Sequence, residues 1–75
     1  MDNNKQMYYF TFNLEHPLSR GYQPILASSY GAARRKMFDV YGDRWCFQYT
    51  QEAWEAQGCK RWYPESQALD ILEAE

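Results

Sequence analysis

The chain has 75 residues and a net charge of −2, which suits one domain and is too short for two. Nucleic-acid-binding domains are more often strongly basic and DNA mimics strongly acidic, so this charge balance favours neither class. Aromatic residues make up 19% of the chain. Because each large ring buries roughly 150–250 Å², we expect these rings to form most of a small core.

The first structured segment follows a polar lead. Residues 1–6 are polar and predict a disordered lead. Residues 7–14 are rich in aromatic residues and alternate in the manner of a strand with one buried face. The buried side chains would be Tyr8, Phe10, Phe12 and Leu14. Tyr9, Thr11 and Asn13 would then lie on an open sheet face, which makes Tyr9 a candidate binding residue.

A second strand and a helix are predicted next. Residues 22–28 resemble a strand in which Pro24, lacking an N–H group, should sit at an edge, a bulge or the strand's start. Pairing with the first strand as an antiparallel hairpin is the simplest arrangement. Ser28 or Ser29 can cap a helix over residues 30–41, and Gly42 suits its C-terminal end. The expected apolar stripe is Tyr30, Ala33, Met37, Val40 and Tyr41.

The second half of the chain predicts a strand and two shorter helical patterns. Residues 44–49 predict a third strand, with Trp45, Phe47 and Tyr49 alternating onto one face. Thr50 can cap a short helix that ends near residue 57. A basic-aromatic linker follows, and Pro64 suits the start of a weaker last helix over residues 64–74.

These elements predict a small single domain of the α+β class. A ββαβα core over residues 7–58 would form a three-stranded antiparallel sheet covered by a helix. Residues 59–75 would supply the linker and the extra C-terminal helix.

No set of residues predicts catalysis, a metal site or a cofactor site. The only histidine, His16, lies in a predicted loop without a specific partner. Cys46 and Cys59 form no CxxC pair, and one histidine completes no zinc set. The four glycines are scattered, so no phosphate-binding loop is expected. We therefore expect a protein that is not an enzyme.

The basic residues offer further candidate contacts. Arg34 and Arg35 lie on the predicted helix, and they either form a solvated face, with Arg35 pairing with Asp39, or contact phosphate or an acidic partner. The basic-aromatic run Lys60, Arg61 and Trp62 either binds a partner or folds back on the core, and Arg44 beside Trp45 is similar. Neither a signal peptide nor a membrane-spanning run is evident, which predicts a cytoplasmic protein with reduced cysteines.

One set of motifs carries a resemblance. These motifs are YYFTF at residues 8–12, HPL at 16–18, AARRKMF at 32–38, and YGDRWCFQYT at 41–50 followed by Trp54. Together they resemble a group of short phage and prophage proteins over roughly residues 8–57, with the block from Tyr41 to Trp54 the most specific part.

The resemblance implies a viral or mobile-element origin in a bacterial host. Small accessory proteins of this kind often inhibit host defence, as anti-CRISPR and anti-restriction proteins do, by occupying a surface of the host enzyme. The first expectation is thus an inhibitor that binds a host protein such as a CRISPR or restriction effector. The alternatives are a nucleic-acid-binding accessory domain and a phage structural or assembly protein that self-associates.

Overall fold

The described part of the chain folds into a small α+β structure. The computed structural model describes residues 5–13, 15, 17, 20–57, 63 and 67–74. Its elements are β1 (Gln6–Phe12), β2 (Gln23–Ala27), α1 (Tyr30–Tyr41), β3 (Trp45–Thr50), α2 (Gln51–Ala56) and β4 (Leu72–Glu73). The expected ββαβα order is confirmed, and a further strand follows it.

The sheet has four strands in the order β3-β1-β2-β4. β1 pairs antiparallel with both β2 and β3, whereas β4 runs parallel to β2. The prediction of a three-stranded antiparallel sheet was therefore wrong in two respects. The sheet has a fourth strand, and that strand pairs in parallel.

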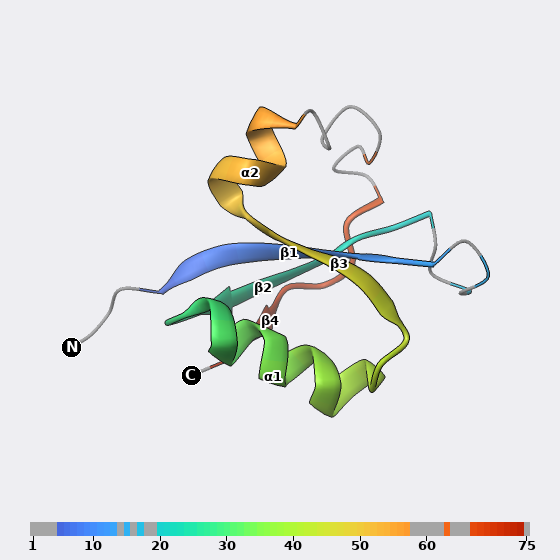
Figure 1. The fold of residues 1–75 in the computed structure, drawn as a ribbon, viewed down its shortest axis with the longest axis horizontal. Coiled ribbons are helices and arrows are strands. Elements are labelled where there is room, and N and C mark those ends of the chain that lie inside the picture. The colour runs from blue at the N-terminus through green and yellow to red at the C-terminus, as the bar shows by residue number, and fades with distance from the viewer. Residues whose placement is uncertain are drawn as a thin grey trace.

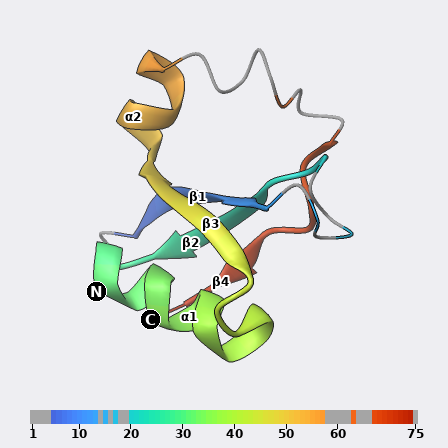
Figure 2. The same ribbon diagram turned by 45° about the vertical axis from the view of Figure 1, so that its right-hand side comes forward.

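The two helices lie on opposite faces of this sheet (Figures 1 and 2). On the α1 side, the main core contains the buried side chains Tyr8, Phe10, Phe12, Ile25, Ala27, Ala33 and Met37. On the α2 side, Tyr22 and Trp54 form a second, aromatic cluster. The expected open face of β1 is thus covered, because α2 returns across it immediately after β3.

Both helix N-termini are capped as predicted. The Ser29 hydroxyl accepts a hydrogen bond from the Ala32 N–H at 3.1 Å, and the Thr50 hydroxyl accepts one from the Ala53 N–H at 3.1 Å. Gly42 ends α1 with φ of +66°, a conformation that L side chains rarely adopt.

The apolar stripe of α1 is narrower than predicted. Ala33 and Met37 are buried and Tyr41 is half-buried, but Tyr30 and Val40 are 47% and 46% exposed. Ala33 and Met37 therefore supply the buried contacts of α1, and Tyr41 packs against the edge of the core.

β3 contains a bulge that the sequence pattern did not reveal. Phe10 of β1 lies opposite Gln48, but Phe12 lies opposite Trp45. Two β3 residues at positions 46–47 therefore occupy the space opposite a single β1 residue.

The bulge corrects the expected alternation of β3. We expected Trp45, Phe47 and Tyr49 to share one face. Instead Trp45 points to the α1 side and contacts the Phe10 ring at 5.2 Å. Tyr49 points to the α2 side, and the Phe47 ring lies 6.3 Å from it. The extra residue shifts the period-two pattern by one, so Trp45 now shares the α1 side with Gln48.

The C-terminal segment is extended where a helix was predicted. Over residues 67–74 the chain runs along β2, with the Leu69 N–H donating to the Tyr22 carbonyl at 2.9 Å and the Ala74 N–H to the Leu26 carbonyl at 2.8 Å. A short isolated helix is only marginally stable, whereas these bonds satisfy carbonyl groups that β2 directs away from β1.

Gln23 fastens this segment to the rest of the fold. Backbone groups alternate along a strand, so the missing N–H of Pro24 faces the C-terminal segment and leaves a gap in the ladder. The buried Gln23 side chain fills that gap: its Nε2 donates to the carbonyls of Pro24 at 2.9 Å and Asp70 at 2.6 Å. Its Oε1 accepts from the Tyr41 hydroxyl at 2.7 Å. Burial raises the pKa of Tyr41, which keeps this hydroxyl protonated at neutral pH.

An ion pair joins the β4 edge to the beginning of β1. Gln6, which the sequence placed in a disordered lead, is the first residue of β1, while residues 1–4 lie outside the described residues. Lys5 Nζ lies 2.5 Å from Glu73 Oε2. The hydrogen bond from Lys5, and then its positive charge, lower the pKa of Glu73 below its ordinary value of 4.5.

This pair predicts a defined pH dependence. Because the folded-state pKa of Glu73 is lowered, the contribution of the pair to stability is fully present above pH 4.5 and is lost as the pH falls through the lowered value. An NMR titration of the Glu73 carboxyl carbon should report a low pKa that returns toward the ordinary range in Lys5→Gln. An unchanged midpoint in that variant would contradict the assignment.

Candidate aromatic–arginine interface

The predicted binding residues do not form one surface. Four of them belong to the described residues: Tyr9 lies on β1, Arg34 and Arg35 on α1, and Arg44 just before β3. The predicted basic-aromatic contacts Lys60, Arg61 and Trp62 lie outside the described residues, as do His16 and Cys59.

Tyr9 is part of the aromatic cluster beneath α2. Its ring stacks on Trp54, with centroids 4.9 Å apart and an angle of 14° between the planes. It also contacts the ring of Tyr22 at 5.9 Å. Its neighbour Thr11 is buried, with 5% of its surface exposed. The face that the sequence left open for a partner is therefore used for internal packing.

Arg34 is exposed on α1, and its guanidinium lies beside two aromatic rings. Its guanidinium carbon is 5.4 Å from the centre of the Phe38 ring and 5.2 Å from the Trp45 ring. Arg34 and Phe38 are four residues apart, which places them together on one helix face. Trp45 reaches the same place from β3, because the bulge turns it toward α1. The two rings contact each other at 5.5 Å.

The surrounding contacts hold this arrangement in place. The Trp45 indole N–H donates to the Gly42 carbonyl at 3.1 Å. Gln48 Nε2 donates to the Tyr30 carbonyl at 3.0 Å, which ties the first turn of α1 to β3. The Tyr30 ring then packs edge-on against Tyr8 at 5.9 Å. The two ends of α1 are thus fixed to the sheet on either side of Arg34.

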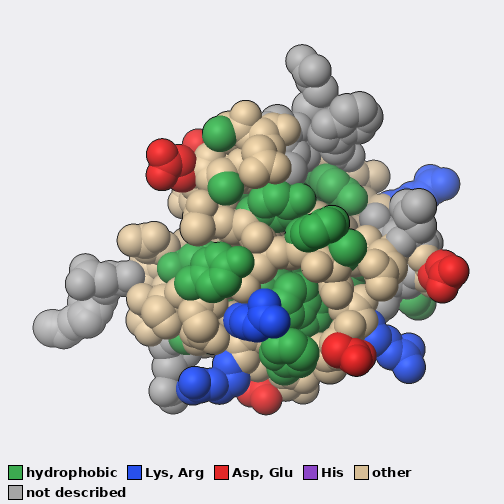
Figure 3. Space-filling view, viewed as in Figure 1, with side chains coloured by type: hydrophobic (Ala, Val, Ile, Leu, Met, Phe, Trp, Pro, Cys, Tyr) green, Lys and Arg blue, Asp and Glu red, His purple; other side chains and the backbone are tan. Residues whose placement is uncertain are grey.

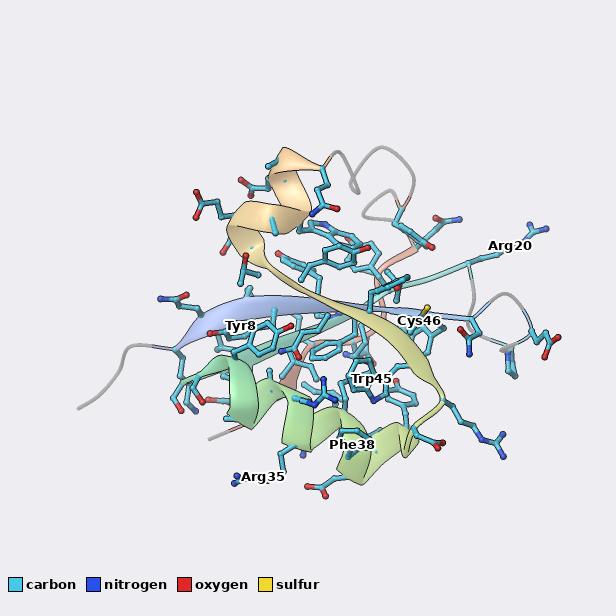
Figure 4. All side chains as sticks on the ribbon, viewed as in Figure 1. Tyr8, Arg20, Arg35, Phe38, Trp45 and Cys46 are labelled. Atoms are coloured by element: carbon cyan, nitrogen blue, oxygen red, sulfur yellow. The ribbon has the colours of Figure 1, made fainter. Side chains whose placement is uncertain are left out.

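We call this surface the aromatic–arginine face, and it consists of Tyr30, Arg34, Phe38 and Trp45. Figure 3 shows apolar side chains gathered around a basic one over α1 and β3. Figure 4 shows Phe38 of α1 and Trp45 of β3 side by side. Tyr30 and Phe38 are 47% and 44% exposed although both are large. The sequence identified Arg34 as a candidate contact but not Tyr30 or Phe38. The spacing of four residues between Tyr30, Arg34 and Phe38 was the signal that they share one helix face.

Arg35 and Arg44 lie elsewhere. Arg35 points away from the sheet in Figure 4 and lines a depression of about 400 Å³ between α1 and the C-terminal segment. Asp39 lines the same depression, but the predicted Arg35–Asp39 ion pair is absent from the described residues. Arg44 lines a separate depression of about 290 Å³ beside Asn13 and Glu15.

Arg34 supplies the charged group of the aromatic–arginine face. The described residues contain no group of three His, Cys, Asp or Glu residues that could hold a metal ion. Cys46 is a free and exposed thiol on β3. Arg34 carries a guanidinium with five N–H donors and makes no ion pair within the described part of the chain. The face can therefore offer stacking surface and charge-assisted hydrogen bonds to a partner.

None of the helices in the described residues is long and apolar enough to span a membrane. Comparisons with protein-family profiles, with curated proteins and with solved structures give no match to this chain.

Proposed function

We propose that this chain is a phage-encoded, non-enzymatic binding protein that inhibits a host defence protein, such as a CRISPR or restriction effector, by covering part of its surface. The observation that carries the proposal is the aromatic–arginine face, where the Phe38 and Trp45 rings lie beside an arginine that has no ion-pair partner in the described residues. A few residues carry most of the binding energy at protein interfaces, and tryptophan, tyrosine and arginine are enriched among them. The resemblance of residues 8–57 to short phage and prophage proteins supports the viral origin.

The geometry of Arg34 favours a protein partner. The cation–π contacts with the Phe38 and Trp45 rings already restrict the arginine side chain, so less conformational entropy is lost when a partner binds. The guanidinium still presents N–H donors at its edge, in the fork that matches a carboxylate. An interface centred here would combine an apolar core with one oriented charge, as protein–protein interfaces commonly do.

A nucleic-acid partner is favoured less by the same geometry. Binding to a phosphate backbone requires several cations along one track. Arg35 and Arg44 line other depressions and do not extend the face around Arg34. If nucleic acid were nevertheless the partner, the affinity would fall steeply with added salt and a nuclease would abolish the complex.

The effect of two substitutions on partner binding provides a quantitative prediction. Arg34→Gln and Phe38→Ala should each weaken binding to the captured host protein by about 2 kcal/mol, or roughly 30-fold, because each removes a central contact. Arg35→Gln is the matched control, since it removes the neighbouring charge on the same helix outside the face. Isothermal titration calorimetry with purified partner measures the three affinities. Equal losses for Arg34→Gln and Arg35→Gln would show that net charge, and not this face, governs binding.

The proposed activity itself is tested by infection. The chain is expressed in bacteria carrying an active CRISPR or restriction system and challenged with a targeted phage. Plaque formation should rise with the unaltered chain and with Arg35→Gln, and should return toward the immune level with Arg34→Gln. A pulldown after nuclease treatment then identifies the bound host enzyme. Immunity that stays intact against every targeted phage when the unaltered chain is expressed would refute the proposal.

A further inference from the structure

We propose that the partner of this protein adds an extended strand to the outer edge of β3 and places a carboxylate side chain on Arg34. This inference rests on the proposed function in that it takes the aromatic–arginine face as the binding surface. It goes further by naming the chemical form of the partner segment, which is an extended strand that carries a carboxylate.

The pairing of the sheet shows which backbone groups of β3 point outward. The Tyr22 and Leu26 carbonyls face the C-terminal segment, so Ile25, between them in the alternation, faces β1. Its partner Tyr8 therefore directs its own backbone groups toward β2 and away from β3. Thr50, which lies opposite Tyr8, must then direct its N–H to the outside of the sheet, while its C=O, as the N-cap carbonyl, accepts the first hydrogen bond of α2.

The same alternation extends to Gln48 and Trp45. Gln48 is two residues from Thr50 and lies opposite Phe10, which also faces β2. Trp45, beyond the bulge, lies opposite Phe12 and follows the same rule. Within the described residues β3 pairs only with β1, so these outward groups have no strand partner there. An extended peptide that adds to this edge as a further strand would form hydrogen bonds with these backbone donors and acceptors.

The two edges of the sheet differ in how they are protected. β4 has only two residues, and the Lys5–Glu73 ion pair lies beside it. Short length and charge are common means by which proteins prevent strands from adding to an edge. β3 has six residues (WCFQYT) with no charge and no proline. Its edge carries only the bulge as protection.

Side chains flank the outer edge of β3 on both sides. Phe47 lies on the α2 side and is 60% exposed, while Trp45, Phe38 and Arg34 lie on the α1 side. Successive side chains of an added strand point to opposite faces. One set would thus pack on Phe47, and the other would reach the aromatic–arginine face. A carboxylate in the second set would meet the guanidinium of Arg34.

A second copy of this chain fits the edge less well than a foreign strand. In a two-fold pair of β3 strands, the bulge at positions 46–47 of each copy would interrupt the pairing of the other. In addition, β3 carries no carboxylate, so the strand of a second copy would bring no anionic partner to Arg34. Both arguments favour a partner segment of different sequence.

The test uses a display library of random dodecapeptides as the probe. The full-length chain is immobilised through its N-terminus and the library is selected against it. The selected peptides should alternate apolar and other residues and carry an aspartate or glutamate. Arg34→Gln should reduce their affinity at least tenfold, while Arg35→Gln should leave it unchanged.

Strand addition is distinguished from side-chain contact by changing the backbone alone. A synthetic fragment of residues 46–75, joined at the native Cys46 to residues 1–45, can carry a methyl group on the Gln48 nitrogen. This group removes one outward N–H and blocks the edge, but keeps the Gln48 side chain. We expect a loss of peptide affinity of at least tenfold relative to the same ligated chain without the methyl group. Phe47→Lys, a charge at an exposed position, should act similarly and serves if the methylated chain does not fold.

Three outcomes would overturn the proposal. The first is a selection that enriches no peptides. The second is a set of enriched peptides whose affinity survives both Gln48 methylation and Phe47→Lys. The third is a dimer in sedimentation that is lost on Gln48 methylation, because a second copy would then be the occupant of the edge. The proposed function fails separately. If inhibition of immunity requires Arg34 but is unaffected by Gln48 methylation, the proposed function stands and strand addition is wrong. If peptides bind at the β3 edge but the chain has no effect on immunity, strand addition stands and the proposed function is wrong.

Discussion

Trp54→Ala should leave the chain largely unfolded at 25 °C. Trp54 is 1% exposed, and its ring contacts Tyr9, Tyr22, Tyr49 and Tyr63. Removing a buried tryptophan costs about 3–5 kcal/mol. A core of this size contributes only about 3–5 kcal/mol in total, so one substitution can consume the whole margin. Far-UV circular dichroism and urea titration measure the result.

Two further variants test whether stability depends on the buried position of an aromatic ring or only on the number of rings in the chain. Phe47→Ala removes a ring that is 60% exposed and should change the free energy of unfolding by no more than about 0.5 kcal/mol. Trp54→Phe keeps an aromatic ring in the cluster and removes the indole N–H, which is buried without a hydrogen-bond partner in the described residues. It should therefore cost clearly less than Trp54→Ala. A cooperative unfolding transition for Trp54→Ala within about 1 kcal/mol of the unaltered chain would show that α2 contributes little to the fold.

Gln23→Met should destabilise the fold by about 2–4 kcal/mol and release the C-terminal segment. Gln23 is 2% exposed, and its amide bonds two groups that are distant in the sequence, the Asp70 carbonyl and the Tyr41 hydroxyl. Methionine fills a similar volume but can neither donate to the carbonyls of Pro24 and Asp70 nor accept from the Tyr41 hydroxyl. Urea titration gives the loss of stability.

Hydrogen exchange shows where Gln23→Met acts. The amides of Leu69 and Ala74 donate to β2 and should exchange faster in the variant than those of α1. Gln51→Ala is the control, because Gln51 is exposed and its amide bonds, within the described part of the chain, only Glu55 at 3.4 Å. If Leu69 and Ala74 remained as protected as in the unaltered chain, the segment would not depend on the Gln23 amide.

Local interactions determined the elements that the sequence predicted correctly. The alternating rings of β1, the Ser29 and Thr50 caps and the positive φ of Gly42 depend on residues within a few positions of one another. The sequence alone therefore placed β1, β2, α1, β3 and α2 in order. It also indicated Arg34 as a candidate contact, although without the rings that orient it.

Only the tertiary structure decided the remaining features, because they depend on partners far along the chain. The bulge in β3 arises from its register with β1 and turns Trp45 toward Arg34, which forms the aromatic–arginine face. The C-terminal segment is extended because Tyr22, 47 positions before Leu69, offers a carbonyl that a helix would leave unpaired. Likewise, α2 covers Tyr9 only once β3 has brought it across the sheet. Periodicity reports which residues share a face of an element, but it does not report which other element will lie against that face.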